Sequence, residues 1–252
     1  MKGRGAHERS KRSDIAKLQL ACYWALSSLR KFMEPSEILE ILRSNGLELS
    51  NVDLSRYIGG HVLPGPKRAR ELLQALYKAE VLEKVLKRVV VIDSRGVVNI
   101  ARLAFDKELL ALAASLALVR FGALKVTKVL TAAVNGVPLA SFVSLILSAG
   151  LCVAKREAEV PECIEVKYFA PEPPRYISLF IPKGALRHND AVLIVDDLLR
   201  SGRTLKALLE LSQKSGAKVK GVFSLVAVGS EWCAVVRSCG FDIYVGYQVA
   251  LA

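Results

Sequence analysis

The stretch of sequence that decides the fold is Ala191-Val192-Leu193-Ile194-Val195-Asp196-Asp197-Leu198-Leu199-Arg200-Ser201-Gly202-Arg203-Thr204. Its first five residues are all apolar, which is typical of a strand buried on both faces of a parallel sheet. Gly202 permits a tight loop, and the N–H groups that open the following helix suit a phosphate, with the Ser201 and Thr204 hydroxyls as further donors. The acidic pair Asp196-Asp197 would repel a bare phosphate. We therefore expect the pair to face a sugar diol, with a magnesium ion nearby that offsets the charge.

Short β-prone runs alternate with helical stretches on both sides of this segment. We predict strands at residues 126–132, 151–155, 191–196, 219–228 and 242–248, and helices at residues 137–148, 202–215 and 231–239. This alternation predicts an α/β fold, in which helices cover a parallel sheet. In such sheets ligands bind at the carboxyl ends of the strands.

The segment Val192–Thr204 resembles the signature of the type I phosphoribosyltransferase family: a hydrophobic strand, an acidic pair and a Thr/Ser-Gly-x-Thr phosphate loop. The resemblance implies that Asp196 and Asp197 hold the ribose 2′- and 3′-hydroxyls of phosphoribosyl pyrophosphate (PRPP). It also implies that the 5′-phosphate is wrapped by the loop Arg200, Ser201, Gly202, Arg203 and Thr204. Arg203 departs from the family, many members of which have a second glycine there. The implied cofactor is Mg²⁺, carried by PRPP rather than held at a metal site of the protein. The alternative interpretation is an acidic strand end followed by an ordinary capped helix.

The resemblance extends from near Asp93 to Ala252. The stretch 132–138 looks like the pyrophosphate loop, which in the family contains a strained peptide bond that aims N–H groups at the ligand. The candidate pyrophosphate-binding residues are Ala133, Val134, Asn135, Gly136, Lys155 and Arg156. Lys155 and Arg156 also fit a solvated strand terminus. The segment Glu157–Tyr176 falls where the family has its mobile loop, a lid that excludes water.

The first part of the chain has a different pattern, with helical periodicity near 3.6. We therefore predict two domains, residues 1–87 and residues 88–252. The predicted helices run from Ile15 to Lys31, from Pro35 to just before Gly46, from a capping box at Ser50–Asp53 to Gly59, and from Lys67 to about Lys87.

The string Leu54–Gly60, followed by Pro64-Gly65-Pro66 and a basic helix, resembles the recognition-helix region of lambda-repressor/Cro-type helix-turn-helix domains. The resemblance implies that the helix Asn51–Ile58 enters the major groove of DNA, held to its bundle by Leu54, Tyr57 and Ile58. The implied contacts to bases or phosphates come from Asn51, Ser55 and Arg56, and those to phosphates from Lys67, Arg68 and Arg70. The alternative is a small helical dimerisation or cover domain whose charges form a solvated face.

The charge, hydropathy and cysteine content of the chain favour some classes of protein over others. The 252 residues include 36 Lys and Arg against 24 Asp and Glu, a formal net charge of +12, which favours a polyanionic partner. No run of 18 uncharged apolar residues occurs, so we expect no membrane span. The five cysteines are scattered and odd in number, so we expect reduced thiols in a cytoplasmic protein.

Before the signature, the residues Val166-Lys167-Tyr168 and the run Ile177–Leu186 resemble the branch of the family that contains the purine repressor and the xanthine and adenine phosphoribosyltransferases. We therefore predict a transcriptional regulator, a homodimer that binds double-stranded DNA through its first domain and senses PRPP or a related ribose phosphate through its second. A base-covering element would have to come from the hairpin-like stretch Val89–Ile100, with Arg95-Gly96 as its turn. The alternatives are an active purine or pyrimidine phosphoribosyltransferase and an RNA-binding attenuation protein of pyrimidine type.

Overall fold

The computed structural model describes residues 2–93, 98–171, 173–237 and 239–250, with side chains from residue 13 onward. The chain divides into two compact units. One, here called the helical unit, comprises Met1–Arg88 and Asp106–Val119. The other, called the sheet unit, comprises Val89–Phe105 and Arg120–Ala252.

The helical unit consists of the following helices: α1 (Lys2–Leu29), α2 (Pro35–Ser44), α3 (Asn51–Ile58), α4 (Pro66–Lys78), α5 (Val81–Val89) and most of α7 (Lys107–Phe121). Helix α1 packs against α3 and α4, and α2 packs against the same two helices. The core is formed by buried leucines such as Leu26, Leu42, Leu54 and Leu72. The Ser50 half of the predicted capping box is confirmed, since the Ser50 hydroxyl accepts a hydrogen bond from the Asp53 N–H at 3.0 Å. The Asp53 carboxylate accepts a hydrogen bond from the Ser50 hydroxyl at 2.8 Å in place of one from a backbone N–H.

The prediction of one continuous helix from Lys67 to Lys87 was wrong. Helix α4 ends at Lys78 and α5 begins at Val81, because Glu80 adopts a left-handed backbone conformation with φ of +51°. The break redirects the chain and lets α5 bury Val81, Leu82, Val85 and Leu86. No glycine or proline marks the position, so the sequence gives no local signal of the break.

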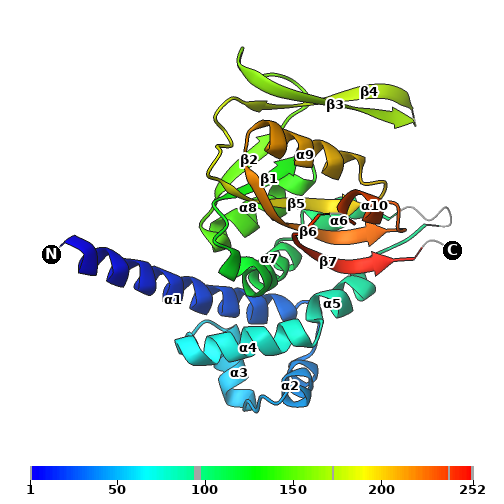
Figure 1. The fold of residues 1–252 in the computed structure, drawn as a ribbon. Helices are drawn as coiled ribbons and strands as arrows, with labels where there is room; N and C mark the ends of the chain where they lie inside the picture. Colours follow the sequence, from blue (N-terminus) through cyan, green and yellow to red (C-terminus); the bar gives the residue numbers. More distant parts are fainter. Residues whose placement is uncertain (1, 94–97, 172, 238, 251–252) are drawn as a thin grey trace. The chain divides into compact units, whose positions relative to one another are not determined.

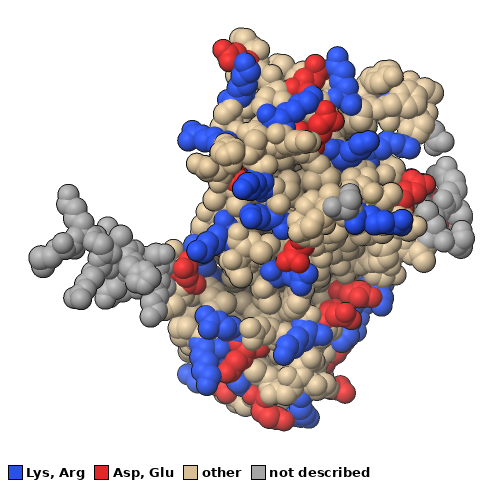
Figure 2. Space-filling view, viewed as in Figure 1, with Lys and Arg blue, Asp and Glu red and all other residues tan. Residues whose placement is uncertain are grey.

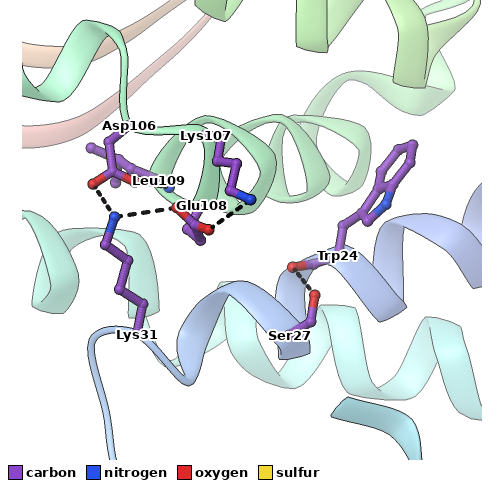
Figure 3. A network of polar contacts seen from close by, with 7 residues as sticks. All are labelled: Trp24, Ser27, Lys31, Asp106, Lys107, Glu108 and Leu109. Carbon is purple, nitrogen blue, oxygen red and sulfur yellow. Dashed lines mark hydrogen bonds and ion pairs between the residues drawn. The ribbon is translucent and has the colours of Figure 1, made fainter. Parts of the chain in front are cut away.

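Helix α7 has no counterpart among the predicted helices. Nearly all its side chains are apolar, and those from Leu109 to Ala117 are buried, as expected of a helix that is apolar on every face. Its first turn is held by the polar network in Figure 3. Asp106 accepts a hydrogen bond from the Leu109 N–H at 3.1 Å, and the Lys31 ammonium lies 2.7 Å from Asp106 and 3.2 Å from Glu108.

The sheet unit contains five parallel strands in the order β2-β1-β5-β6-β7. Their bounds are β1 (Lys128–Ala132), β2 (Gly150–Ala154), β5 (Ala191–Leu199), β6 (Lys218–Val228) and β7 (Asp242–Val249). The helices between them are α8 (Gly136–Leu147) and α9 (Arg203–Lys214). The crossover from β1 to β2 and that from β5 to β6 run in opposite directions, so right-handed connections place α8 and α9 on opposite faces (Figure 1). The predicted α/β class with a parallel sheet is confirmed.

Two further predictions in this unit need correction. The segment 157–176, predicted to be a lid loop, contains most of an antiparallel ribbon formed by β3 (Cys163–Pro171) and β4 (Pro174–Pro182). The ribbon packs on the outer side of α9, where Val166, Leu179 and Ile181 join the same buried core as the apolar residues of that helix (Figure 1). The predicted helix 231–239 shrinks to the single turn α10 (Cys233–Val236).

The remaining elements of the sheet unit are short: α6 (Ile100–Ala104) and the 3₁₀ turn η1 (Gly122–Leu124). The predicted hairpin at Val89–Ile100 appears as a bridge between Ile92 and Val98, and its predicted turn Arg95-Gly96 lies outside the described residues. Throughout the described ranges, no helix is both long enough and apolar enough to cross a bilayer.

Candidate functional site

The loops after β1 and β5 meet at one edge of the sheet. Strand β1 pairs with β2 on one side and with β5 on the other, with Lys128 opposite Val192, so the strand order reverses between β1 and β5. Loops diverge at such a switch point and leave a crevice at the carboxyl ends of the strands. The contact is close here, because a Cβ atom at Gly136 would lie 2.5 Å from Thr131 Oγ1 and 3.0 Å from Asp196 Oδ1.

Residues 133–136, the candidate binding residues of the predicted pyrophosphate loop 132–138, connect β1 to α8. The peptide bond between Ala133 and Val134 is cis. Val134 is exposed, Asn135 is half-buried and Gly136 is buried at the start of α8. The structure thus brings this loop against the acidic pair of β5, although some 60 residues separate them in the chain.

Asp196 and Asp197 are buried inside β5, each with only 7% of its surface exposed. The sequence predicted a strand ending at Asp196, whereas β5 continues to Leu199. The Asp197 N–H donates to Asp196 Oδ1 at 3.1 Å. Burial, together with the neighbouring Asp197 carboxylate, raises the pKa of Asp196 well above its ordinary value. Within the described part of the chain, neither carboxylate forms a salt bridge, so two acids are held at this edge without a protein cation.

The predicted phosphate loop follows directly. Gly202 has φ of +73° and immediately precedes α9. Its carbonyl oxygen accepts a hydrogen bond from the Lys206 N–H at 2.8 Å. A Cβ atom at Gly202 would lie 2.8 Å from Val235 Cγ2 and 3.0 Å from Trp232 Cα, so both the backbone conformation and the space require glycine. The first turn of α9 contains no acidic residue, which leaves its N–H groups open to an anion.

The side chains of this loop differ in exposure. Arg200 and Arg203 are exposed, whereas Ser201 and Thr204 are half-buried. Thr204 Oγ1 lies 3.5 Å from the hydroxyl of Tyr168, which reaches it from β3. Tyr168 belongs to the sequence run that carried the branch resemblance, but it was not among the candidate site residues, because β3 itself was not predicted.

Lys155 and Arg156 are placed apart from the acidic pair. Lys155 follows the edge strand β2 and forms an isolated bridge with Phe180. Two strand spacings, about 10 Å, separate β2 from β5. The Lys155 ammonium lies 2.5 Å from Glu159 Oε1, beside a cavity of about 310 Å³ that both residues line. Arg156 is exposed.

The second candidate surface is the outer face of α3 in the helical unit. Leu54 and Ile58 are buried and Tyr57 is half-buried, as the resemblance implied. The exposed residues of this helix are Asn51, Val52, Ser55 and Arg56. Val52 has 66% of its surface exposed and was not among the predicted site residues. Its position beside Asn51 in the first turn of a capped helix could have predicted this exposure.

The basic residues of α4 are placed unequally. Lys67 and Arg70 are exposed, and the Lys67 ammonium comes no closer than 4.0 Å to Glu71. Arg68 is half-buried, and its guanidinium donates to the carbonyl oxygen of Glu48 and lies 3.6 Å from Glu71. In the view of Figure 2, Lys and Arg are interspersed with Asp and Glu rather than gathered on one patch. The case for this surface therefore rests on α3 and its two exposed basic neighbours rather than on overall charge.

Comparison with known proteins gives a family match. Residues 101–239 match the model of the phosphoribosyl transferase domain, which covers more than half of the chain. The structure resembles the crystal structure of adenine phosphoribosyltransferase from Rhodothermus marinus, with a TM-score of 0.58 and 22% identity over 67% of this chain and 99% of the other. This likeness confirms the type I phosphoribosyltransferase fold expected from the sequence.

Two kinds of curated relative match in sequence. The probable purine biosynthesis transcriptional regulator PurR of Streptococcus pneumoniae is 31% identical over 101 residues, which are 39% of this chain and 37% of that protein. The xanthine phosphoribosyltransferase of Deinococcus deserti is 34% identical over 115 residues, which are 44% of this chain and 59% of that enzyme. The matched region thus spans under two-fifths of the regulator and about three-fifths of the enzyme.

Proposed function

The chain belongs to the phosphoribosyl transferase domain family, and from that premise we propose that its sheet unit binds Mg²⁺–PRPP or a related ribose phosphate at the carboxyl ends of β1 and β5. One observation carries the proposal. Two adjacent carboxylates are buried, one of them, Asp196, lies against Gly136 of the 133–136 loop, and five residues after Asp197 a left-handed glycine opens a helix. A ribose 5-phosphate fits these groups, with its two ring hydroxyls at the carboxylates and its phosphate at the start of the helix.

The roles of the residues follow from their chemistry. Asp196 and Asp197 accept hydrogen bonds from the two ribose hydroxyls, which offsets the cost of burying both acids. The loop from Arg200 to Thr204 takes the 5′-phosphate on backbone N–H groups at the start of α9. The residues Ala133, Val134, Asn135 and Gly136 face the pyrophosphate. Arg156 reaches it from the edge of the sheet, and Lys155 would do so only by leaving Glu159.

The residues present also fit a magnesium ion brought by the ligand. Mg²⁺ is usually held by one or two carboxylates together with substrate phosphates, and it keeps several waters. Asp196 and Asp197 are such a pair, and no cluster of three or more potential ligands occurs among the described residues. When bound, the ion neutralises the charge of the pyrophosphate and of the acidic pair.

The second part of the proposal concerns the helical unit. We propose that α3 enters the major groove of DNA, with Asn51, Ser55 and Arg56 facing the bases and Lys67 and Arg70 on phosphates. Arg68 would reach a phosphate only by leaving Glu48 and Glu71. A homodimer would present two such helices to a palindromic site. Support comes from the capped α3, its exposed polar residues and the named role of the pneumococcal relative.

Taken together, the chain is proposed to be a transcriptional regulator whose affinity for DNA depends on PRPP. An equilibrium between two forms, shifted by the ligand, requires no chemistry at the ribose. A coupling of about 1–3 kcal/mol would be ordinary, and it must be equal when measured from either site. Gel-shift titration with and without Mg²⁺–PRPP, paired with calorimetry of PRPP with and without DNA, tests both directions. Equal DNA affinity in both conditions would remove the sensor role.

The other candidate function is an active purine phosphoribosyltransferase, which the enzyme relative at 34% identity favours. Incubation of the chain with PRPP, Mg²⁺ and each nucleobase in turn separates the two functions. Nucleotide formation at about 1 s⁻¹ or faster would establish the enzyme. Saturable PRPP binding without nucleotide would support the regulator.

A further inference from the structure

The hydroxyl of Tyr168 lies beside the proposed phosphate loop but belongs to another element. Tyr168 shares a face of β3 with Val166, and both pack on the core that α9 completes, while Lys167 and Phe169 are exposed. At the other end of α9 the Lys214 ammonium donates to the carbonyl oxygen of Glu165 at 3.1 Å. The ribbon therefore has a hydrogen bond to α9 at the carboxyl end of the helix, and at the amino end the Tyr168 hydroxyl lies beside Thr204.

Packing alone does not account for the phenol group. A phenylalanine would fill the same apolar space, so packing does not explain why this residue carries a hydroxyl group. Among the described residues its hydroxyl has one polar partner, Thr204 Oγ1 at 3.5 Å, whereas a good O–H···O bond measures about 2.5–3.0 Å. Two hydroxyls at that separation each keep most of their donor capacity. Both stand at the amino end of α9, where the first backbone N–H groups also lack partners within the helix.

These groups together outline a place for one anionic oxygen. An oxygen about 2.7 Å from both hydroxyls completes a hydrogen bond with each, because two donors 3.5 Å apart can point at a single acceptor. The helix dipole and the absence of acids from the first turn of α9 favour negative charge at the same point.

We propose that Tyr168 is a phosphate-binding residue that donates a hydrogen bond to the 5′-phosphate of the ligand. The inference rests on the proposed function and extends it, because it adds a donor from outside the phosphate loop. It also makes the β3–β4 ribbon part of the site, so that a phosphomonoester, rather than a ribose or a pyrophosphate group, fastens the ribbon to α9.

The test replaces Tyr168 by phenylalanine in the full chain and uses two probes, ribose 5-phosphate and inorganic pyrophosphate, each with Mg²⁺. Calorimetry should show ribose 5-phosphate binding about tenfold more weakly to Tyr168→Phe, since hydrogen bonds to charged groups are the strong ones. Pyrophosphate affinity should not change. The matched control is Tyr176→Phe on the same ribbon. Tyr176 is 76% exposed, and its ring contacts Phe169 edge-on. This control should bind both probes like the parent chain.

The outcomes separate this inference from the function on which it rests. Unchanged affinity of Tyr168→Phe for ribose 5-phosphate, in a parent chain that binds it, would overturn the inference and leave the proposed function intact. An equal loss for both probes would also overturn it, because the phenol would then support the whole site rather than the phosphate. Failure of the parent chain to bind PRPP would remove the proposed function itself.

Discussion

The two candidate surfaces differ in how deeply their polar groups are buried. At the edge of the sheet two carboxylates are almost inaccessible and a left-handed glycine is enclosed by Val235 and Trp232. On α3 the polar residues project into solvent. Burying a charge costs free energy, and at the sheet edge this cost appears in the raised pKa of Asp196. An asparagine or arginine that stays in water has no such energetic cost. The role of α3 therefore has to be tested by measuring DNA binding.

The largest effect is expected from removing both buried acids. Asp196→Asn combined with Asp197→Asn should weaken Mg²⁺–PRPP binding at a cost of about 1–3 kcal/mol per residue, because each amide replaces an acceptor of a ribose hydroxyl with a partial donor. Calorimetry measures the loss. Asp190→Asn is the matched control, since Asp190 precedes the same strand at its opposite end and accepts from Thr127. A folded double variant with unchanged affinity would contradict the assignment.

Two glycines, one in each unit, allow the two units to be compared by the free energy of unfolding that an alanine substitution costs. Gly202→Ala should cost more than about 2 kcal/mol, because a left-handed conformation and a Cβ 2.8 Å from Val235 are both unfavourable. Gly46→Ala, with φ of +77° and no atom within 4 Å of its Cβ, should cost only the conformational part, about 1–2 kcal/mol.

The two tryptophans allow each unit to be followed separately. Trp24 lies in α1 and Trp232 lies beside Gly202. Denaturant unfolding of variants that keep one tryptophan, with phenylalanine at the other position, should show Gly202→Ala shifting the Trp232 transition and Gly46→Ala shifting the Trp24 transition. Equal shifts for the two substitutions would show that the close approach at Gly202 is relieved by movement of its neighbours.

Substitutions on the helical unit should have intermediate effects, seen only with DNA. Arg56→Ala should lose about 1–3 kcal/mol for a selected sequence, as expected if its guanidinium reaches a base edge. Lys67→Ala should weaken all sequences alike and reduce the salt dependence by about one phosphate contact. The control is Lys84→Ala, an exposed lysine on α5 of the same unit. If the Lys84 and Lys67 variants have the same DNA affinity in gel shifts, the charges of α4 are a solvated face rather than a DNA contact.

A smaller effect is expected from pH. The raised pKa of Asp196 means that the folded chain keeps a proton that the unfolded chain releases near the ordinary aspartate value. Its contribution to stability is therefore fully present below that ordinary value and is lost as pH rises through the raised pKa. The free energy of unfolding, followed by Trp232, should fall over this range, and Asp196→Asn should flatten the fall. A parent chain whose Trp232 transition strengthens with pH there would contradict the burial of this acid.

The sequence predicted the parts of the site that depend on local rules. The apolar strand before Asp196, the tight loop at Gly202 and the cap at Ser50 each have a short-range cause, and the structure bears out all three. The remainder depends on tertiary packing. Helix α7 is apolar on every face and so lacks amphipathic periodicity, and Glu80 breaks a helix without a breaker residue. Tyr168 acquires its neighbour only once the ribbon packs on α9.

The assignment of α7 to the helical unit affects how experiments should be designed. Asp106–Val119 cluster with that unit, whereas the family match begins at residue 101. A deletion of the first 87 residues would leave α7 without the helices with which it clusters and without Lys31 beside Asp106. Single substitutions therefore test the two candidate surfaces more cleanly than truncation does.

The pairing of β1 with β5 also sets an order of events during synthesis. The helical unit is complete once α7 ends at Phe121, whereas β5 needs β1 on one side and β6, which ends at Val228, on the other. At about 5–20 residues per second, the ribosome takes roughly 5–20 s to proceed from the end of β1 to the end of β6. A nascent chain thus carries the proposed DNA-facing helix for seconds before any pocket for a sugar phosphate can exist, and during that interval its hold on DNA would be independent of the metabolite.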